Sequence, residues 1–188
     1  MAKLVYMTLM SLDGYVADRS GNFDWAMPDA EVHAFVNELE RGYGTLLYGR
    51  RMYDVMTFWE DQTALKDEPK VVQEYGEIWR AADKIVFSRS LRAARTARTR
   101  LVGEFDASEV REMKVRAPRD LAVGGSELAG VAFHAGLVDE IRLIIVPVAV
   151  GDGTAALPRD MQVPLVLLDE RTFANGMVHL HYVVGPPS

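Results

Sequence analysis

Hydrophobic and polar positions follow two alternating patterns along the chain. Short apolar runs at residues 45–48 and 84–87 are typical of buried strands. Between such runs, apolar residues recur at helical spacing, as they do from Asp29 to Arg41. Strands that alternate with helices favour a sheet of parallel strands joined by helical crossovers. The pattern therefore predicts an α/β fold.

The end of the chain breaks this alternation. The expected strands are residues 3–10, 45–48, 84–87, 121–123, 141–150, 165–173 and 178–184. The expected helices are residues 29–41, residues 50–58, a helix opened by Pro69, residues 108–115 and a helix through 128–132. No convincing helix lies between the last two strands, where Asn175-Gly176 is a hairpin turn signal. We expect one domain over residues 1–188, with a mostly parallel central sheet and an antiparallel C-terminal hairpin.

Three of the expected strands end at residues suited to binding a ligand. These ends are Gly49, Ser88 and the Gly124-Gly125 pair. In an open α/β sheet, ligands bind at the carboxyl ends of the strands, where loops meet helix N-termini. A glycine there lets the backbone approach a ligand closely, and the N–H groups of the next helix attract phosphate. Alternatively, the glycines only permit tight turns, and spacing alone leaves both interpretations open.

Arginine and serine side chains flank these strand ends. Arg50 and Arg51 follow the first glycine directly and could hold a phosphate in bidentate fashion. Ser88 and Arg89 could hold a second phosphate or a ribose. An ordinary solvated surface would carry the same residue types. The Arg-rich stretch from Arg89 to Arg100 is equally consistent with a solvated loop or edge and with a phosphate site.

Composition limits the classes of function. Of 188 residues, 49% are apolar and 26% are charged, an ordinary globular balance. The net charge of −6 argues against nonspecific nucleic-acid binding. Without cysteine, the chain has no disulfide and no thiolate nucleophile. The longest apolar run, Leu143 to Val150, is interrupted by Pro147 and is far shorter than the ~20 residues of a membrane helix. We expect a cytoplasmic protein.

Two other kinds of site are not indicated. Among the four histidines, only His179 and His181 stand close together, and they alternate on an expected strand. Two histidines on a strand are more typical of a surface or an interface than of a metal site, so no metal is expected. The sequence also lacks the Gly-x-Ser-x-Gly turn of nucleophilic hydrolases.

Four segments, in order and at suitable spacing, carry a resemblance to a known family. They are Ser11-Leu12-Asp13-Gly14-Tyr15-Val16-Ala17, Leu47-Tyr48-Gly49-Arg50-Arg51-Met52-Tyr53, Asp120-Leu121-Ala122-Val123-Gly124-Gly125-Ser126, and Val138-Asp139-Glu140-Ile141-Arg142-Leu143 running on to Pro147 and Gly151-Asp152-Gly153. Over nearly its whole length the chain resembles the dihydrofolate reductase-like superfamily. The branch is the one typified by the riboflavin-biosynthesis reductase, the C-terminal domain of bacterial deaminase/reductase-type proteins.

This resemblance implies a three-layer fold that binds NADPH across the carboxyl ends of the parallel strands. The resemblance implies that Gly49, Arg50 and Arg51 face the phosphates of the adenosine half. It implies that Ser88 and Arg89 lie near the 2′-phosphate. It also implies that Gly124, Gly125 and Ser126 contact the pyrophosphate and the nicotinamide ribose. These residues are the ones that the strand-end argument selects independently.

The loop from Leu12 to Pro28 should border the nicotinamide. Within this loop, Tyr15, Asp24 and Trp25 are candidates for a substrate wall. The rings of Tyr15 and Trp25 could stack on a planar heterocycle. A plain packing role accounts for either aromatic residue at least as well.

The resemblance also places a substrate-binding carboxylate near the start of the first helix. Glu31 lies nearest that position, and Asp29 is the other candidate. A half-buried carboxylate there could hydrogen-bond a pteridine or pyrimidine and relay a proton. In the alternative, Asp29 caps the helix and Glu31 favours its positive N-terminus.

The sequence departs from the riboflavin-pathway branch after its first glycine turn. Residues 52–59 are aromatic and lack the Asp-Pro element with which that branch handles a phosphorylated sugar chain. We therefore expect an NADPH-dependent reductase of another small planar heterocycle, pterin- or pyrimidine-like. The alternative, from a different class, is a catalytically silent module that binds a nucleotide or flavin. For both we expect a homodimer, since the apolar terminal strands could pack across a two-fold axis.

Overall fold

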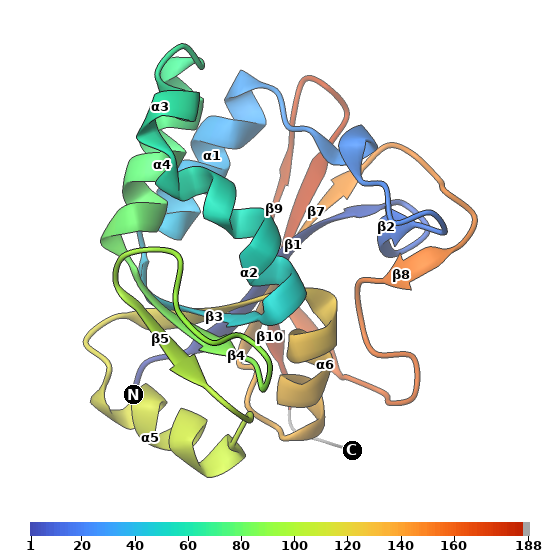
Figure 1. Cartoon of the computed structure of the whole chain (residues 1–188). Coiled ribbons are helices and arrows are strands. Elements are labelled where there is room, and N and C mark those ends of the chain that lie inside the picture. The colour runs from blue at the N-terminus through green and yellow to red at the C-terminus, as the bar shows by residue number, and fades with distance from the viewer. Residues whose placement is uncertain (186–188) are drawn as a thin grey trace.

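An eight-stranded sheet runs through the centre of the molecule (Figure 1). The structure is a computed structural model that describes residues 1–185. The strands of the central sheet are β1 (Leu4–Ser11), β3 (Tyr43–Gly49), β4 (Asp83–Phe87), β5 (Thr99–Val102), β6 (Asp120–Gly124), β7 (Glu140–Val146), β9 (Leu165–Thr172) and β10 (Val178–Val184). A separate two-stranded sheet pairs β2 (Tyr15–Asp18) with β8 (Gly153–Ala155).

The central sheet has a parallel part and an antiparallel part. Its strand order is β5-β4-β3-β6-β1-β7-β10-β9. The first six strands in this order, β5, β4, β3, β6, β1 and β7, are parallel to their neighbours. In contrast, β10 is antiparallel to both β7 and β9. In the turn between β9 and β10, the Asn175 side chain accepts a hydrogen bond from the Met177 N–H group at 3.0 Å, and Gly176 has φ +85°. The predicted hairpin is therefore confirmed.

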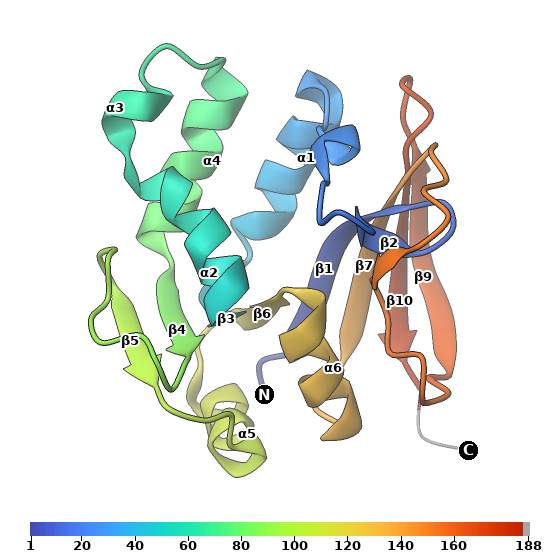
Figure 2. The same ribbon diagram turned by 45° about the vertical axis from the view of Figure 1, so that its right-hand side comes forward.

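Helices cover both faces of the sheet. They are α1 (Ala30–Glu40), α2 (Arg50–Met56), α3 (Gln62–Leu65), α4 (Lys70–Ala81), α5 (Ala107–Arg116) and α6 (Ser126–His134), with the short 3-10 helices η1 (Asp24–Ala26) and η2 (Thr57–Glu60). Helices α1, α2 and α4 lie on one face, and α5 and α6 lie on the other (Figure 2). Their buried side chains pack against the sheet there. Within residues 1–185, no helix is both long and apolar enough to span a membrane.

Local sequence explains most of these boundaries. The Asp29 side chain accepts a hydrogen bond from the Val32 N–H group at 2.9 Å, so it caps α1. Pro69 precedes α4 and fixes the backbone where the helix begins. The strand expected to reach Val150 ends at Val146 instead, because Pro147 has no N–H group to donate to a sheet.

Several short elements were not expected from the sequence. These are β2, β8, α3, η1, η2 and β5, and β5 overlaps the end of the Arg-rich stretch. A three- or four-residue strand carries too little periodicity to be recognised, and β2 meets β8 from a distant part of the chain. Their pairing leaves no room for a side chain at Gly153, where a Cβ atom would lie 2.0 Å from the Ala17 carbonyl oxygen.

Strand register places the predicted ligand-binding ends together. Tyr48 of β3 pairs with Gly124 of β6, and Gly49 pairs with Phe87 of β4. Ser88 follows Phe87 directly, so the three strand ends occupy neighbouring positions on one edge of the sheet. This edge is where the functional site is to be sought.

Candidate functional site

An apolar cavity of about 380 Å³ lies on the sheet face that α1, α2 and α4 cover. Its walls also include β1, β3, β6 and the segment from Val16 to Met27. A second hollow of about 460 Å³ lies beside α5, near Thr45 and Leu121 at the beginnings of β3 and β6. That hollow is more open and contains none of the residues predicted to bind a ligand. The first cavity is the better candidate because it reaches the predicted strand ends.

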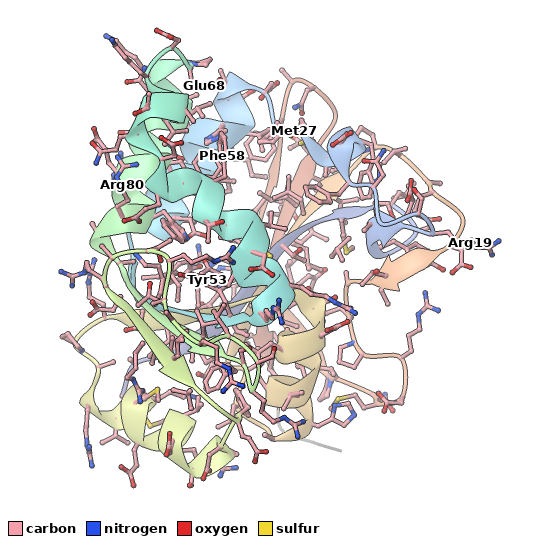
Figure 3. The ribbon with its side chains drawn as sticks, in the orientation of Figure 1. Arg19, Met27, Tyr53, Phe58, Glu68 and Arg80 are labelled. Carbon is pink, nitrogen blue, oxygen red and sulfur yellow. The ribbon has the colours of Figure 1, made fainter. Side chains whose placement is uncertain are left out.

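The cavity has an exposed mouth and a buried inner end. Phe23, Met27 and Val55 line it and are respectively 45%, 71% and 48% exposed, so they mark the mouth. Met27 lies between η1 and α1, at the outside of the molecule (Figure 3). Leu46 and Tyr48 line it and are only 2% and 4% exposed. A ligand would therefore enter past the loop that precedes α1 and meet the sheet.

The second glycine turn forms part of the cavity wall. Gly124, Gly125 and Ser126 all line it. A Cβ atom on Gly124 would lie 2.5 Å from the Tyr48 ring, and Gly125 has φ +87°, a conformation that favours glycine. Gly125 also precedes the first turn of α6. This backbone can therefore approach a ligand closely and offer it helix N–H groups.

The other predicted cofactor residues, Gly49, Arg50, Arg51, Ser88 and Arg89, form what we call the rim. The Arg50 guanidinium donates to the Ser90 hydroxyl at 2.7 Å, and the Arg51 guanidinium pairs with Glu127 at 2.7 Å. Both arginines are exposed, and Met52, next to Arg51, lines the cavity. The rim therefore adjoins the cavity but lies in solvent.

The end of β4 supplies the outer part of the rim. The Ser88 hydroxyl oxygen accepts hydrogen bonds from the N–H groups of Ser90 and Leu91 at 3.3 and 3.1 Å. Arg89 lies 3.8 Å from Glu104, and both side chains are largely exposed. Because these contacts are exposed to solvent, Ser88 and Arg89 could give them up and contact a ligand instead.

Two further arginines of the Arg-rich stretch are tied to neighbouring elements. Arg95 pairs with Asp54, and its backbone N–H group donates to the hydroxyl of Tyr53 at 2.9 Å. Arg98 pairs with Asp83 at 2.8 Å. These arginines fasten the loop and β5 to α2 and β4.

The predicted substrate residues are in the expected loop but do not line the cavity. Arg159 lies over the Tyr15 ring at 5.0 Å. Trp25 donates from its indole N–H group to the Asn22 carbonyl oxygen at 3.2 Å, and Asp24 begins η1. The loop residues that do line the cavity are Val16, Ala17, Phe23, Ala26 and Met27. Each of these lies within two positions of a predicted residue.

The two predicted carboxylates also lie away from the cavity. Asp29 caps α1, as described above. The Glu31 carboxylate pairs with Arg171 at 3.2 Å and accepts from the Ala174 N–H group at 3.4 Å. Glu31 thus joins α1 to the end of the β9–β10 hairpin, and its role as a proton relay stays a prediction.

A different carboxyl group lines the cavity: that of Glu40, the last residue of α1. Burial raises its pKa to about 7. Sequence reasoning missed this residue. The available signal was its position four residues after Val36 and eight after Val32, which places it on the buried side of the same helix.

Comparisons with known proteins agree with this architecture. The model of the RibD C-terminal domain matches residues 2–179. The uncharacterized protein YyaP of Bacillus subtilis (strain 168) is 27% identical over 184 residues, which cover 96% of this chain and 94% of YyaP. The family match confirms the resemblance noted in the sequence.

Solved structures with the same fold include two of similar length. A putative riboflavin biosynthesis protein from Shewanella sp. PV-4 has a TM-score of 0.76 and 18% identity, covering 99% of this chain and 100% of that one. A pyrimidine reductase-like protein from Corynebacterium diphtheriae has a TM-score of 0.67 and 12% identity, covering 99% and 93%. At these identities the likeness shows the fold alone, and it confirms the predicted fold class.

Proposed function

This chain belongs to the RibD C-terminal domain family, and we propose that it is an NADPH-dependent reductase of a small planar heterocycle, pterin- or pyrimidine-like. One observation carries the proposal. The Gly124–Ser126 turn, suited to close backbone contact, lines the same apolar cavity as Met7 and Leu9 of β1. A dinucleotide bound along the strand ends would thus have a water-poor cavity beside its reactive ring.

The residues at the strand ends fit such a cofactor. Gly124 and Gly125 form a turn that we call the cradle, where neighbouring side chains leave little room for a Cβ atom. Because these residues have no side chains, their backbone can contact a pyrophosphate directly. Ser126 begins α6, whose first N–H groups point toward an anion at that position. In the proposed complex, NADPH supplies the hydride, and these residues orient its nicotinamide half.

The rim would hold the other half of the cofactor. Arg50, Arg51 and Arg89 now contact only exposed partners, and surface ion pairs are worth about 0–1 kcal/mol. Exchanging such a partner for a phosphate therefore costs little. Arg89 and Ser88, at the end of β4, are proposed to face the 2′-phosphate that distinguishes NADPH from NADH.

Titration of the intrinsic tryptophan fluorescence with both cofactors tests this proposal. We expect NADPH to bind more tightly than NADH, and Arg89→Ala to weaken that preference. Arg19→Ala is the matched control, because Arg19 pairs with Asp152 at 2.6 Å at the far edge of the molecule (Figure 3). Failure of the wild-type protein to bind either cofactor would overturn the reductase proposal.

A catalytically silent module that binds a nucleotide or flavin is the second candidate. It is favoured by the fact that neither Asp29 nor Glu31 lines the cavity. The two functions differ in turnover. Loss of NADPH absorbance with a pterin, pyrimidine or quinone-like acceptor supports the reductase, whereas cofactor binding without turnover across that panel supports the silent module.

The assembly proposed for either function is a cytoplasmic homodimer. Val166, Leu167 and Leu168 stand side by side on β9 and are 58%, 46% and 53% exposed. Because β9 is an edge strand, its backbone hydrogen-bonding groups also face outward on one side. A second copy of the chain could cover both features. The absence of cysteine from the sequence suits a reducing cytoplasm.

A further inference from the structure

Glu40 is half-buried and lines the inner end of the cavity, where the neighbouring side chains that the structure describes give its carboxyl group no hydrogen bond. Val36 of α1, Leu46 and Tyr48 of β3, and Tyr75 of α4 line the same end. Within residues 1–185, no hydrogen bond or positive charge offsets the burial of the Glu40 carboxyl group. A carboxyl group in apolar surroundings is unfavourable unless it finds a partner.

We propose that Glu40 is a specificity-determining residue of the cavity, which selects a flat, largely apolar molecule carrying N–H donors at its inner end. The proposal deepens the reductase function proposed above and rests on it for the identification of this molecule as a substrate. The ligand supplies the partner that the protein does not. A planar N–H fork suits the purpose, because two parallel hydrogen bonds to a carboxylate give both strength and orientation.

The other groups near Glu40 do not compete for this role. Burial and the nearby Glu40 charge raise the pKa values of the hydroxyls of Tyr43, Tyr48 and Tyr75, so these stay protonated near neutral pH. The Tyr48 oxygen already accepts a hydrogen bond from the Trp79 indole at 3.1 Å. None of these hydroxyls carries a charge that would balance the carboxylate.

Charged groups on the neighbouring helices are engaged with one another. Arg41, the residue after Glu40, pairs with Glu74 of α4. The Asn37 amide donates to the Val71 carbonyl oxygen at 2.9 Å and to Glu74 at 3.0 Å. On β7 and β10, Arg142 and His181 face Glu140. These contacts engage the neighbouring charges, so Glu40 is the acidic group that the inner end presents to a ligand.

The walls set the rest of the selectivity. Met7, Leu9, Met52 and Ala122 give the cavity an apolar lining that favours a ring over an extended polar chain. A ligand with its own carboxylate at the inner end would be repelled by an ionised Glu40. The expected order of affinity is therefore an amidinium-bearing ring first, a neutral ring next and a benzoate last.

Benzamidine and benzoate are matched probes for this order, since they differ mainly in the group attached to one ring. We expect calorimetry to show benzamidine binding to the wild-type protein, about tenfold more tightly at pH 8 than at pH 6, because a group with a pKa of about 7 ionises across that range. Glu40→Gln, which keeps the side-chain shape, should lose at least tenfold in affinity and the pH dependence. Glu38→Gln, at an exposed position of the same helix, should bind like the wild type.

Two results would overturn the inference: equal benzamidine affinity in the wild type and Glu40→Gln, or benzoate binding as tightly as benzamidine. A carbon-13 NMR titration keeps the test decisive if Glu40→Gln folds poorly. The wild type should show one glutamate carboxyl that titrates near pH 7 and shifts to lower pH when benzamidine is added. No such resonance, or no shift, contradicts the proposal.

The cofactor titration separates this inference from the proposed function. If the wild type binds NADPH but the probes give no Glu40-dependent binding, the substrate inference is wrong and the reductase proposal stands. If benzamidine binds through Glu40 but neither NADPH nor NADH binds, the cavity is a ligand site and the reductase proposal is wrong.

Discussion

The rim carries arginines, whereas the inner end of the cavity carries a carboxyl group. At the rim, Arg50, Arg51 and Arg89 are exposed, and each already contacts an acidic or hydroxyl partner. At the inner end, Glu40 lies among apolar and tyrosine side chains, and within residues 1–185 no cation lies beside it. Water screens the rim charges, so their contacts are weak and exchangeable.

This difference shows which charged groups have little effect on folding stability and which ones lower it. A surface arginine can be gained or lost with little effect on folding. A buried carboxyl group destabilises the protein whenever it is ionised, since the folded state cannot solvate it as water does. The two regions should therefore respond differently to pH, to added volume and to loss of charge.

The largest effect should come from ionisation of Glu40. Its pKa rises from an ordinary 4.5 to about 7 in the folded state, so the folded protein holds this proton more strongly than the unfolded chain. Stability is then highest below the unfolded pKa and falls as pH rises toward 7, by about 3 kcal/mol for this group. Urea denaturation at several pH values should show this loss in the wild type but not in Glu40→Gln.

The comparison must be made as a difference between the two proteins. His179 is buried, and burial lowers its pKa to about 4, so its protonation destabilises the fold as pH falls from 6.5. The contribution of His179 to the free energy of unfolding therefore rises with pH, whereas that of Glu40 falls, over nearly the same pH range. Because both proteins contain His179, subtraction removes it. A flat difference between pH 4.5 and pH 8 would show that the Glu40 carboxyl group does not lie in apolar surroundings.

A smaller effect is expected where the two regions meet, at Gly124. Gly124→Val should cost about 2 kcal/mol, because its side chain would collide with the Tyr48 ring, and overpacking of this kind typically costs 1–3 kcal/mol. NADPH binding should be lost as well. Thermal unfolding and the fluorescence titration measure the two effects.

Gly130→Ala is the matched control for Gly124→Val. Gly130 lies within α6, and a Cβ atom there would meet nothing within 4 Å. Alanine is the better helix former by about 1 kcal/mol, so this variant should be slightly more stable and bind NADPH normally. If both variants lose cofactor binding, the effect does not come from the cradle at Gly124.

The smallest effect on stability should come from the rim. Arg51→Ala breaks one exposed pair with Glu127, which we expect to change the free energy of unfolding by less than about 0.5 kcal/mol. Its effect on NADPH affinity should nonetheless be several-fold, and should shrink as salt is added. If Arg51→Ala loses much stability, or binds NADPH as tightly as the wild type at low salt, the rim does not differ from the inner end in the way described.

Sequence reasoning was most successful where a residue type is demanded by the backbone. Gly124 and Gly125 were selected because a strand that turns into a helix near a ligand needs glycine, and both line the cavity. Reasoning was less successful within the loop that ends at Pro28. Tyr15 and Trp25 were selected for their rings, yet the cavity wall is formed by their neighbours Val16 and Ala26. Which side of an irregular loop faces inward is set by distant contacts.

By itself, the sequence determined the order of the longer strands and helices, the antiparallel hairpin, the glycine turns and the family. These depend on periodicity, turn chemistry and motifs, which act over a few residues. Only the tertiary structure decided that β2 pairs with β8, that Glu31 faces Arg171, and that Glu40 lines the cavity. The environment of a carboxyl group is the sum of what distant segments place around it. No local pattern records that sum, which is why the recognition residue we propose emerged from the fold.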